Sequence, residues 1–433
     1  SMPSEMLMKI FSYLDAASLL SVGCVNKRFY HLASDNGIWL KIYSSCYKAK
    51  RTIWEVKSGH TETVSSGCAA LCDRNLGYWK KEYIFKHIAA VEARVKQLIK
   101  PVDPYTGLPY KNKEAIKVCG LSWIIVLKDK NGKEHVVQKA NLSFKSTSVI
   151  ILWYNAEWPH LGILSTLKLF GIVPLLPDKS NNGPHRRSLI AEYQLANLTA
   201  NSVPLGTDRI VQLFALQPGL VVGLWKEENE IAFVMASLHY HQLLERSTLG
   251  SATVQYASPT VQPMMDDIDP EYGLHGYSLH LELHGRSHVY QCGTFKNLFC
   301  RKGDIADGYL RLIVTSSKDN TTYMVLDEKP ALSWETDAFQ GNVEDCYIMD
   351  VTLLDETGKP FWCFSSPVYL ELYSETSSLY DYIGPVYTTD YADSEGKVHV
   401  ELVCLEETKE CFIVNLVLYI CTKKVNNLHG TNY

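Results

Sequence analysis

The sequence predicts an α+β protein in which N-terminal helices precede a mainly antiparallel, sandwich- or barrel-like β region. In the first forty residues, and again from about 74 to 99, apolar side chains recur every three or four positions, which is the spacing of one helix face. From Tyr43 to about Ser66 the pattern is irregular. Beyond Pro101 the chain consists of short runs rich in β-branched and aromatic residues, separated by Gly, Pro, Asn and Asp. We see no repeat of fixed period, which disfavours a propeller.

The N-terminal stretch predicts three short helices. Pro3 suits a first helical position, and Glu5 follows in the first turn, where a negative charge complements the helix dipole. Asp15 and Asn26 each precede an apolar segment and can act as N-caps of the second and third helices. The run then closes on the turn-rich residues 34–37.

These helices carry more apolar surface than they can cover by themselves. A unit of about 40 residues buries too small a fraction of its surface to be stable without disulfides, a metal or a partner. The stretch has no metal-ligand pattern, and Cys24 has no neighbouring cysteine. We therefore expect part of the apolar surface to be covered by the rest of the chain or by another protein.

The residues of this stretch also form a recognisable motif. It consists of Pro3-Ser4-Glu5, Leu7, Ile10 to Asp15, Leu19-Leu20, Cys24 to Phe29, Leu32-Ala33 and Trp39. The set resembles the F-box, the three-helix element of receptor subunits in Skp–cullin–F-box (SCF) ubiquitin ligases. The resemblance runs through the whole motif, with one departure: Met2 stands where the family prefers Leu.

The resemblance implies a contact with the adaptor, S-phase kinase-associated protein, and through it with cullin and RING subunits. The positions that line this contact in the family are Pro3, Leu7, Ile10, Leu14, Val25 and Trp39. The alternative role for residues of the motif is to form its own core. We favour this core role for Leu20, Phe29 and Leu32, which are not among the six. The resemblance further implies a receptor that binds a protein substrate and contributes no catalytic residue or cofactor of its own.

We expect three segments: an F-box at 1–45, a helical linker at 46–105 and a β region at 106–433. Within the linker, helical spacing predicts a long amphipathic helix from about 74 to 99, whose Trp and Tyr would dock on the next domain. The proline- and acid-rich residues 254–273 are either a division between two β units or a long surface loop.

Strands are predicted throughout the β region, beginning with a hairpin that turns at Asn131-Gly132. Two short helices interrupt them, at 161–170 and 239–246. The predicted strands are 123–128, 136–139, 149–154, 209–216, 220–225, 231–237, 277–284, 288–292, 309–315, 322–326, 347–354, 361–364, 368–372, 398–405 and 411–419.

Composition excludes several classes of protein. A formal net charge of −5 gives no basic field for nucleic acid. The longest apolar stretch near the end, 411–421, is too short to cross a bilayer, so we expect no membrane insertion. The 12 cysteines are scattered without a CxxC pair, which favours reduced thiols and a cytoplasmic or nuclear protein.

One strand carries residues that could bind a metal. His280, Glu282 and His284 alternate with leucines, so all three leave the same face. We interpret this face as the solvated side of a half-buried strand and predict no metal site. The acidic residues 266–273 lack the spacing of a calcium loop and are interpreted as solvated too. No catalytic motif is recognised.

Aromatic clusters at strand ends are the candidates for substrate contact, because Trp and Tyr anchor many interfaces. Tyr154, Trp158 and Trp362 are the residues we select, with plain sandwich core as the alternative. Two rival functions remain at this point. One is a glycan receptor in which Trp153 or Trp158 stacks on a sugar, and the other is a metal hydrolase that uses His280 and His284.

Overall fold

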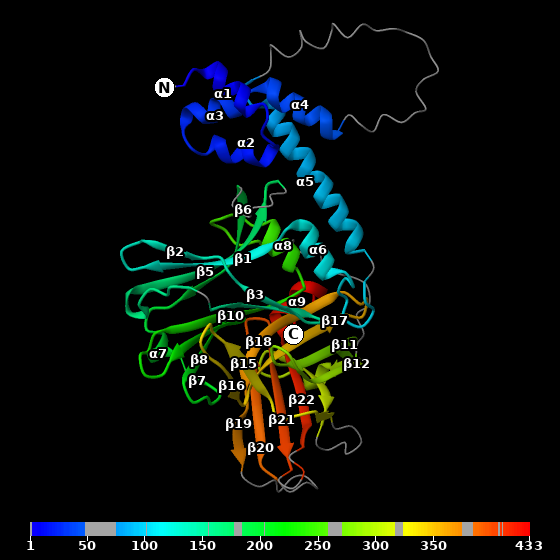
Figure 1. Ribbon diagram of the computed structural model, residues 1–433. Coiled ribbons are helices and arrows are strands. Elements are labelled where there is room, and N and C mark those ends of the chain that lie inside the picture. Colours follow the sequence, from blue (N-terminus) through cyan, green and yellow to red (C-terminus); the bar gives the residue numbers. More distant parts are fainter. Residues whose placement is uncertain are drawn as a thin grey trace. The chain divides into compact units, whose positions relative to one another are not determined.

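The computed structural model describes most of the 433-residue chain (Figure 1). The described residues are 2–47, 75–100, 102–154, 156–176, 184–202, 204–258, 271–316, 324–374, 384–405, 408 and 410–433. The chain forms two compact units. Unit 1 comprises Ser1–Lys100, Glu114–Ser122 and Ile172–Arg187, and unit 2 comprises Pro101–Lys113, Trp123–Gly171 and Ser188–Tyr433. Helices followed by a mainly antiparallel β region confirm the predicted fold class.

The first helices of unit 1 include two that begin directly after their predicted capping residues. The helices are α1 Ser4–Phe11, α2 Ala16–Gly23, α3 Lys27–Ala33, α4 Asn36–Tyr47 and α5 Tyr78–Leu98. The carboxylate of Asp15 accepts a hydrogen bond from the Ser18 amide at 2.8 Å, and the Asn26 side chain accepts from Phe29 at 2.9 Å, as the two predicted N-caps require. The turn predicted at 34–37 instead begins α4, because Asp35 accepts from two amides of its first turn.

The aromatic side chains of α5 complete the core of unit 1. Trp39 is fully buried, and its ring lies 5.6 Å from that of Tyr83, while Trp79 lies 5.0 Å from Tyr43. The expectation that these residues of the long helix dock on the following domain is therefore wrong. They pack on α4, whose apolar face was hidden from the sequence analysis by the irregular pattern after Tyr43.

The strands of the described residues form five sheets. The first has the order β2-β1-β5-β6 and the second β3-β4-β10-β9-β8-β7. Their bounds are β1 Ser122–Asp129, β2 Glu134–Val137, β3 Asn141–Phe144, β4 Ser148–Trp153, β5 Leu164–Pro174, β6 His185–Gln194, β7 Pro204–Leu205, β8 Val211–Leu216, β9 Leu220–Trp225 and β10 Ile231–His239.

The third sheet has the order β12-β11-β17-β18, and the fourth has the order β13-β22-β21-β20-β19 with β14 also paired to β22. β15 and β16 form a separate hairpin. Their bounds are β11 Tyr272–His284, β12 Val289–Arg301, β13 Tyr309–Thr315, β14 Met324–Leu326, β15 Ala331–Glu335, β16 Gln340–Glu344, β17 Cys346–Leu354, β18 Pro360–Tyr369, β19 Glu371–Ser374, β20 Val386–Ala392, β21 Gly396–Cys404 and β22 Cys411–Cys421.

The helices that follow α5 in the described part of the chain are short. They are α6 Asn112–Cys119, α7 Leu198–Asn201, α8 Leu243–Thr248 and α9 Thr422–His429, with 3-10 turns at Leu161–Ile163 and Lys302–Asp304. The helix predicted at 161–170 is wrong, since most of it belongs to β5, and the one predicted at 239–246 begins only at Leu243. None of the described helices is long and apolar enough to span a bilayer.

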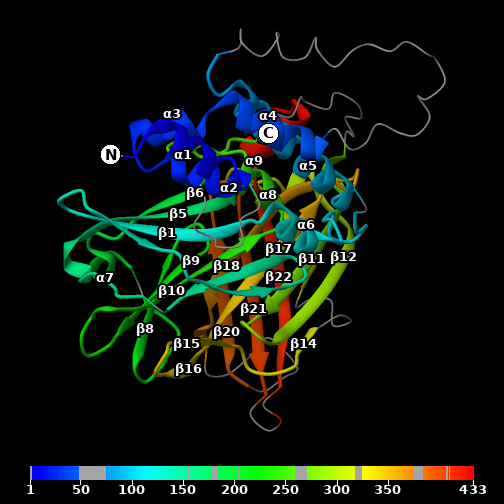
Figure 2. The same ribbon diagram turned by 45° about the horizontal axis from the view of Figure 1, so that its top comes forward.

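The main core of unit 2 lies between the third and fourth sheets, where apolar residues of β11 and β17 meet those of β21 and β22 (Figure 2). On its other side the third sheet approaches the second, with β18 in contact with β10. Cys404 and Cys411 join β21 to β22 through a disulfide, which the expectation of reduced thiols did not anticipate. Most of the proposed division at 254–273, including the acidic residues, lies outside the described residues.

The pairing of β9 with β10 generates a prediction about packing. Gly223 lies opposite Phe233, whose ring occupies the space of a missing side chain: an added Cβ would lie 2.6 Å from it. The ring is fully buried and stacks on Trp334, with the two ring centroids 5.7 Å apart. We expect Gly223→Ala to lower the free energy of unfolding by about 1–3 kcal/mol, measured from urea denaturation midpoints.

Gly162→Ala is the matched control, because an added Cβ there meets nothing within 4 Å. Its effect should stay within about 0.5 kcal/mol. Equal effects of the two substitutions would contradict this account of the β9–β10 contact.

Candidate functional site

The N-terminal helices are held together by a closed core. The indole N–H of Trp39 donates to the carbonyl of Ala33 at 2.7 Å, and Leu19 is fully buried beside it. The Arg28 guanidinium donates to the Met2 carbonyl at 2.7 Å and to the Ser4 hydroxyl at 3.2 Å, which ties the start of the chain to α3. The unit therefore positions α1 firmly.

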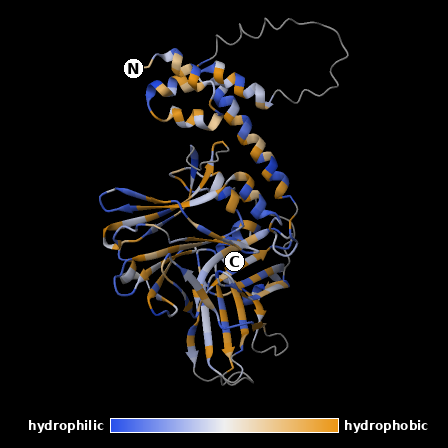
Figure 3. Cartoon of the chain, in the orientation of Figure 1, coloured by the Kyte–Doolittle hydropathy of each residue, from blue (hydrophilic) through white to orange (hydrophobic). Residues whose placement is uncertain are grey.

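A stripe along α1 and the residues that flank it at both ends stays outside this core. Met2, Met6, Ile10 and Tyr13 follow one another at three- and four-residue spacing and are 51%, 56%, 47% and 80% exposed. We call these four residues the α1 apolar face. Figure 3 shows how apolar and polar residues alternate along the N-terminal helices. Four large apolar side chains on one exposed stripe are typical of a surface that another protein covers.

The six residues expected to contact the adaptor divide into two groups. Pro3, Ile10 and Val25 are exposed and Leu14 is half-buried, so these four offer surface to a partner. Leu7 and Trp39 are buried in the core of the helices, and Trp39 has no exposed surface at all. In this chain a direct contact would require those two residues to be uncovered first.

The aromatic candidates for substrate contact also differ in exposure. Tyr154 and Trp158 are half-buried. The expectation that Trp362 is exposed is wrong: its ring is 1% exposed, packs on Phe364, and donates its indole N–H to Asp393 at 3.1 Å. Trp153, the other residue proposed to stack on a sugar, is completely buried.

The polar face of β11 is not solvated. His280, Glu282 and His284 are 8%, 2% and 0% exposed, because residues of the second sheet and its loops cover them. The carboxylate of Glu282 accepts a hydrogen bond from the hydroxyl of Ser146, in the segment that joins β3 to β4. Burial, and then the neighbouring Asp350 carboxylate, raise the pKa of Glu282. A buried polar layer therefore separates the second and third sheets.

His284 and Asp350 form the centre of this layer. The Nε2 of His284 donates to Asp350 Oδ2 at 2.9 Å, and its Nδ1 donates to the Gly285 carbonyl at 3.0 Å. Burial by itself would lower the pKa of His284, but the Asp350 carboxylate raises it above the ordinary value. Burial would likewise raise the pKa of Asp350, and His284 reverses that effect and lowers it. The pair is an imidazolium with a carboxylate, both fully buried.

His239, at the end of β10, is held in the neutral state, in contrast to the protonated His284. Its Nδ1 accepts the backbone N–H of His241 at 3.0 Å, so the proton lies on Nε2, which donates to the Thr352 hydroxyl at 2.7 Å. A second proton on Nδ1 would oppose the amide of His241. Burial lowers the pKa of His239 to about 3, in agreement with a neutral ring.

Comparison with known proteins identifies the helical unit. Residues 1–45 match the F-box-like family. The chain is 51% identical to F-box only protein 15 of Macaca fascicularis, with 100% of both chains covered. The chain belongs to the F-box protein family. It is also 51% identical to F-box only protein 15 of Homo sapiens, of which 85% is covered. The identity to that of Mus musculus is 41%, over 99% of this chain and 100% of the relative.

Two features of this F-box protein escaped the sequence analysis. Met6 and Tyr13 belong to the α1 apolar face, but they are not among the residues expected to contact the adaptor. Asp350 was missed because its strand was recognised from the apolar residues around it. The signal that could have revealed it is a carboxylate within a run of apolar residues, because a buried charge requires a partner.

The neutral state of His239 generates a prediction about pH. Its pKa lies below the unfolded value of about 6.5, so on acidification the unfolded chain takes up a proton that the folded chain does not. This group alone should lower the free energy of unfolding by about 1.4 kcal/mol per pH unit between about pH 6 and pH 4. His239→Gln should reduce the slope by that amount in chemical denaturation at a series of pH values.

His31→Gln on exposed α3 is the control and should leave the slope unchanged. A His239→Gln chain whose stability depends on pH as steeply as that of the original protein would show that His239 is protonated in the folded state.

Proposed function

We propose that this chain is the substrate-recognition subunit of an SCF ubiquitin ligase. Its F-box binds the S-phase kinase-associated protein adaptor, and thereby cullin and RING subunits, while the β region holds a protein substrate. The observation that carries the proposal is the α1 apolar face on a unit whose core is already closed. Membership of the F-box family supports the choice of partner.

The adaptor contact is proposed to combine the α1 apolar face with Pro3, Leu14 and Val25. Burial of exposed methyl and aromatic groups supplies the free energy of binding, at about 25 cal/mol for each Å² of apolar surface removed from water. Leu7 and Trp39 act beneath this surface by keeping α1 in place.

The contribution of such a subunit to ubiquitination is proximity. Holding the substrate in the same assembly as the conjugating enzyme raises the local concentration of its lysines around the ubiquitin donor. The proposed division of labour places adaptor binding in residues 1–45 and substrate binding in residues 106–433, joined by the helical linker. The subunit itself supplies no catalytic side chain and acts in the cytoplasm or nucleus, before proteasomal degradation of the target.

Ile10→Asp tests the adaptor contact. Ile10 is 47% exposed, so a carboxylate there is tolerated by the isolated chain but would be desolvated against an apolar partner. We expect the dissociation constant for the purified adaptor to rise at least about 30-fold, measured by calorimetry. The double change Ile10→Asp with Leu14→Asp should abolish capture and leave the β region folded.

Phe299→Asp is a matched control, because Phe299 is 50% exposed on β12 in unit 2. It should bind the adaptor as the original chain does. Far-ultraviolet circular dichroism of each variant checks that α1–α3 are intact. Retained adaptor affinity in folded Ile10→Asp would exclude the proposed contact.

Trp158→Ala tests the substrate side. If Trp158 anchors the target, its loss should lower recovery of ubiquitinated proteins about tenfold or more in a substrate-trapping experiment with the proteasome inhibited. Adaptor capture should be unaffected. The same recovery from both chains would remove Trp158 from the substrate surface.

A further inference from the structure

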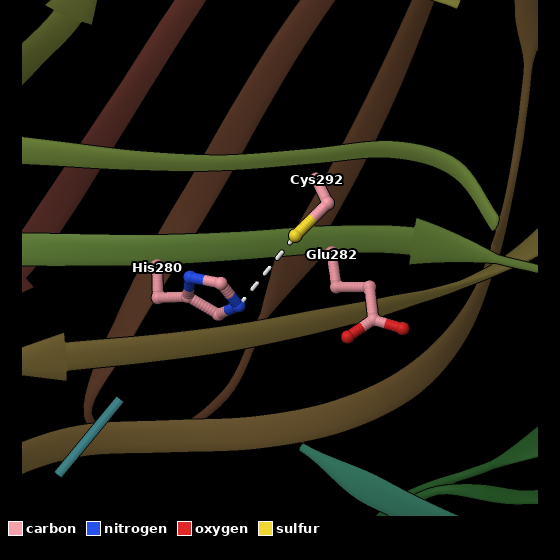
Figure 4. Close-up of side chains that lie close together, drawn as sticks. All are labelled: His280, Glu282 and Cys292. Atoms are coloured by element: carbon pink, nitrogen blue, oxygen red, sulfur yellow. Dashed lines mark hydrogen bonds between the residues drawn. The ribbon is translucent and has the colours of Figure 1, made fainter. Parts of the chain in front are cut away.

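The hairpin of β11 and β12 brings three metal-ligating residue types to one place. In its antiparallel register His280 lies opposite Thr294 and Glu282 opposite Cys292, so all four side chains share one face. Figure 4 shows the imidazole of His280, the carboxylate of Glu282 and the thiol of Cys292 converging beside these strands. Among the described residues, the ligand atoms of these three lie within 4.8 Å of one another.

The spacing suits a small tetrahedral ion. His280 Nε2 and Cys292 Sγ are 3.8 Å apart. A zinc ion bound at about 2.0 Å to nitrogen and about 2.3 Å to sulfur separates two tetrahedral ligands by roughly 3.5 Å. A movement of a few tenths of an ångström would therefore bring these two donors to the spacing of zinc ligands.

Neighbouring groups already orient the donors. Nδ1 of His280 lies 2.8 Å from the Thr294 hydroxyl, and donation of its proton there leaves the Nε2 lone pair directed toward Cys292. A hydrogen bond on the far nitrogen is the usual way a metal-binding histidine is held. The hydroxyl of Ser146, between β3 and β4, donates to the Glu282 carboxylate and holds it from the opposite side.

Burial leaves one side of the cluster open. His280 and Glu282 are buried, whereas Cys292 is exposed and provides a path for entry. His284, which the sequence analysis considered as a ligand with His280, cannot take part, because both of its nitrogens donate hydrogen bonds to Asp350 and Gly285.

We propose that His280, Glu282 and Cys292 bind one zinc ion or a cation of similar softness, with water in the fourth position. Nitrogen, sulfur and a single carboxylate favour Zn²⁺ over Mg²⁺ or Ca²⁺, which require mainly oxygen ligands. This differs from the prediction of no metal, which assumed that the face of β11 was solvated. The site is independent of the proposed adaptor contact.

Titration of the full-length, chelator-treated chain with Co²⁺ and then Zn²⁺ tests the proposal. One equivalent of Co²⁺ should give tetrahedral d–d absorption and a thiolate-to-cobalt charge-transfer band, and one equivalent of Zn²⁺ should displace it. Cys292→Ser should lose the charge-transfer band, and His280→Gln and Glu282→Gln should each weaken binding more than tenfold. Cys24→Ser, which removes an exposed thiol of unit 1, should change nothing.

Thr294→Val adds a test that keeps all three ligands. Loss of the hydrogen bond to Nδ1 should weaken binding about 10- to 100-fold while the charge-transfer band remains. Unfolding midpoints measured with chelator show whether each variant is folded. Absence of a stoichiometric cobalt complex in the original chain, or binding that survives in Cys292→Ser and His280→Gln alike, would overturn the proposal.

Discussion

The hydrogen bonds to the Asp350 carboxylate are the constraint on which the β region depends. One oxygen accepts from the Thr147 hydroxyl at 2.7 Å and from His284 at 2.9 Å, and the other accepts from Ser365, whose hydroxyl also contacts Ser237. These donors come from both the second and the third sheet. A buried carboxylate that loses its charged partner costs about 3–5 kcal/mol, so only an arrangement of the sheets that supplies these donors is stable.

This constraint also determines what β11 presents to its surroundings. Because His284 is fixed against Asp350, the two-residue period of the strand directs Glu282 and His280 to the same covered side. The register with β12 then places Cys292 and Thr294 beside them. The donors of the proposed zinc site are thus brought together by the polar layer between the sheets and by the pairing of one hairpin.

The two compact units differ in how completely they bury their apolar and polar side chains. Unit 1 is small and completes its interior with aromatic residues of α5, yet its α1 apolar face remains exposed. Unit 2 is large enough to bury a polar layer as well as an apolar core. Such a pair of properties suits the receptor proposed above, with an apolar surface for the adaptor on one unit and a well-packed framework for substrate binding on the other.

The sequence by itself determined the features that depend on neighbouring residues. The caps at Asp15 and Asn26, the long helix ended near Pro101 and most β runs follow from local hydrogen bonding, helix spacing and strand propensity. The F-box resemblance likewise rests on contiguous residues. Only the tertiary structure decided which surfaces are covered. Strand alternation shows that β11 has two unlike faces, but its polar face is buried through contacts remote in sequence, such as that of Ser146 with Glu282.

The same reason explains the remaining differences. Leu164 and Leu167 have the spacing of a helix, and pairing in the first sheet makes them part of β5. Trp362 lies in a short predicted strand, and Tyr391 of a distant strand covers it. Exposure of a side chain depends on what the fold brings over it, and long-range contacts of this kind leave no local periodicity in the chain.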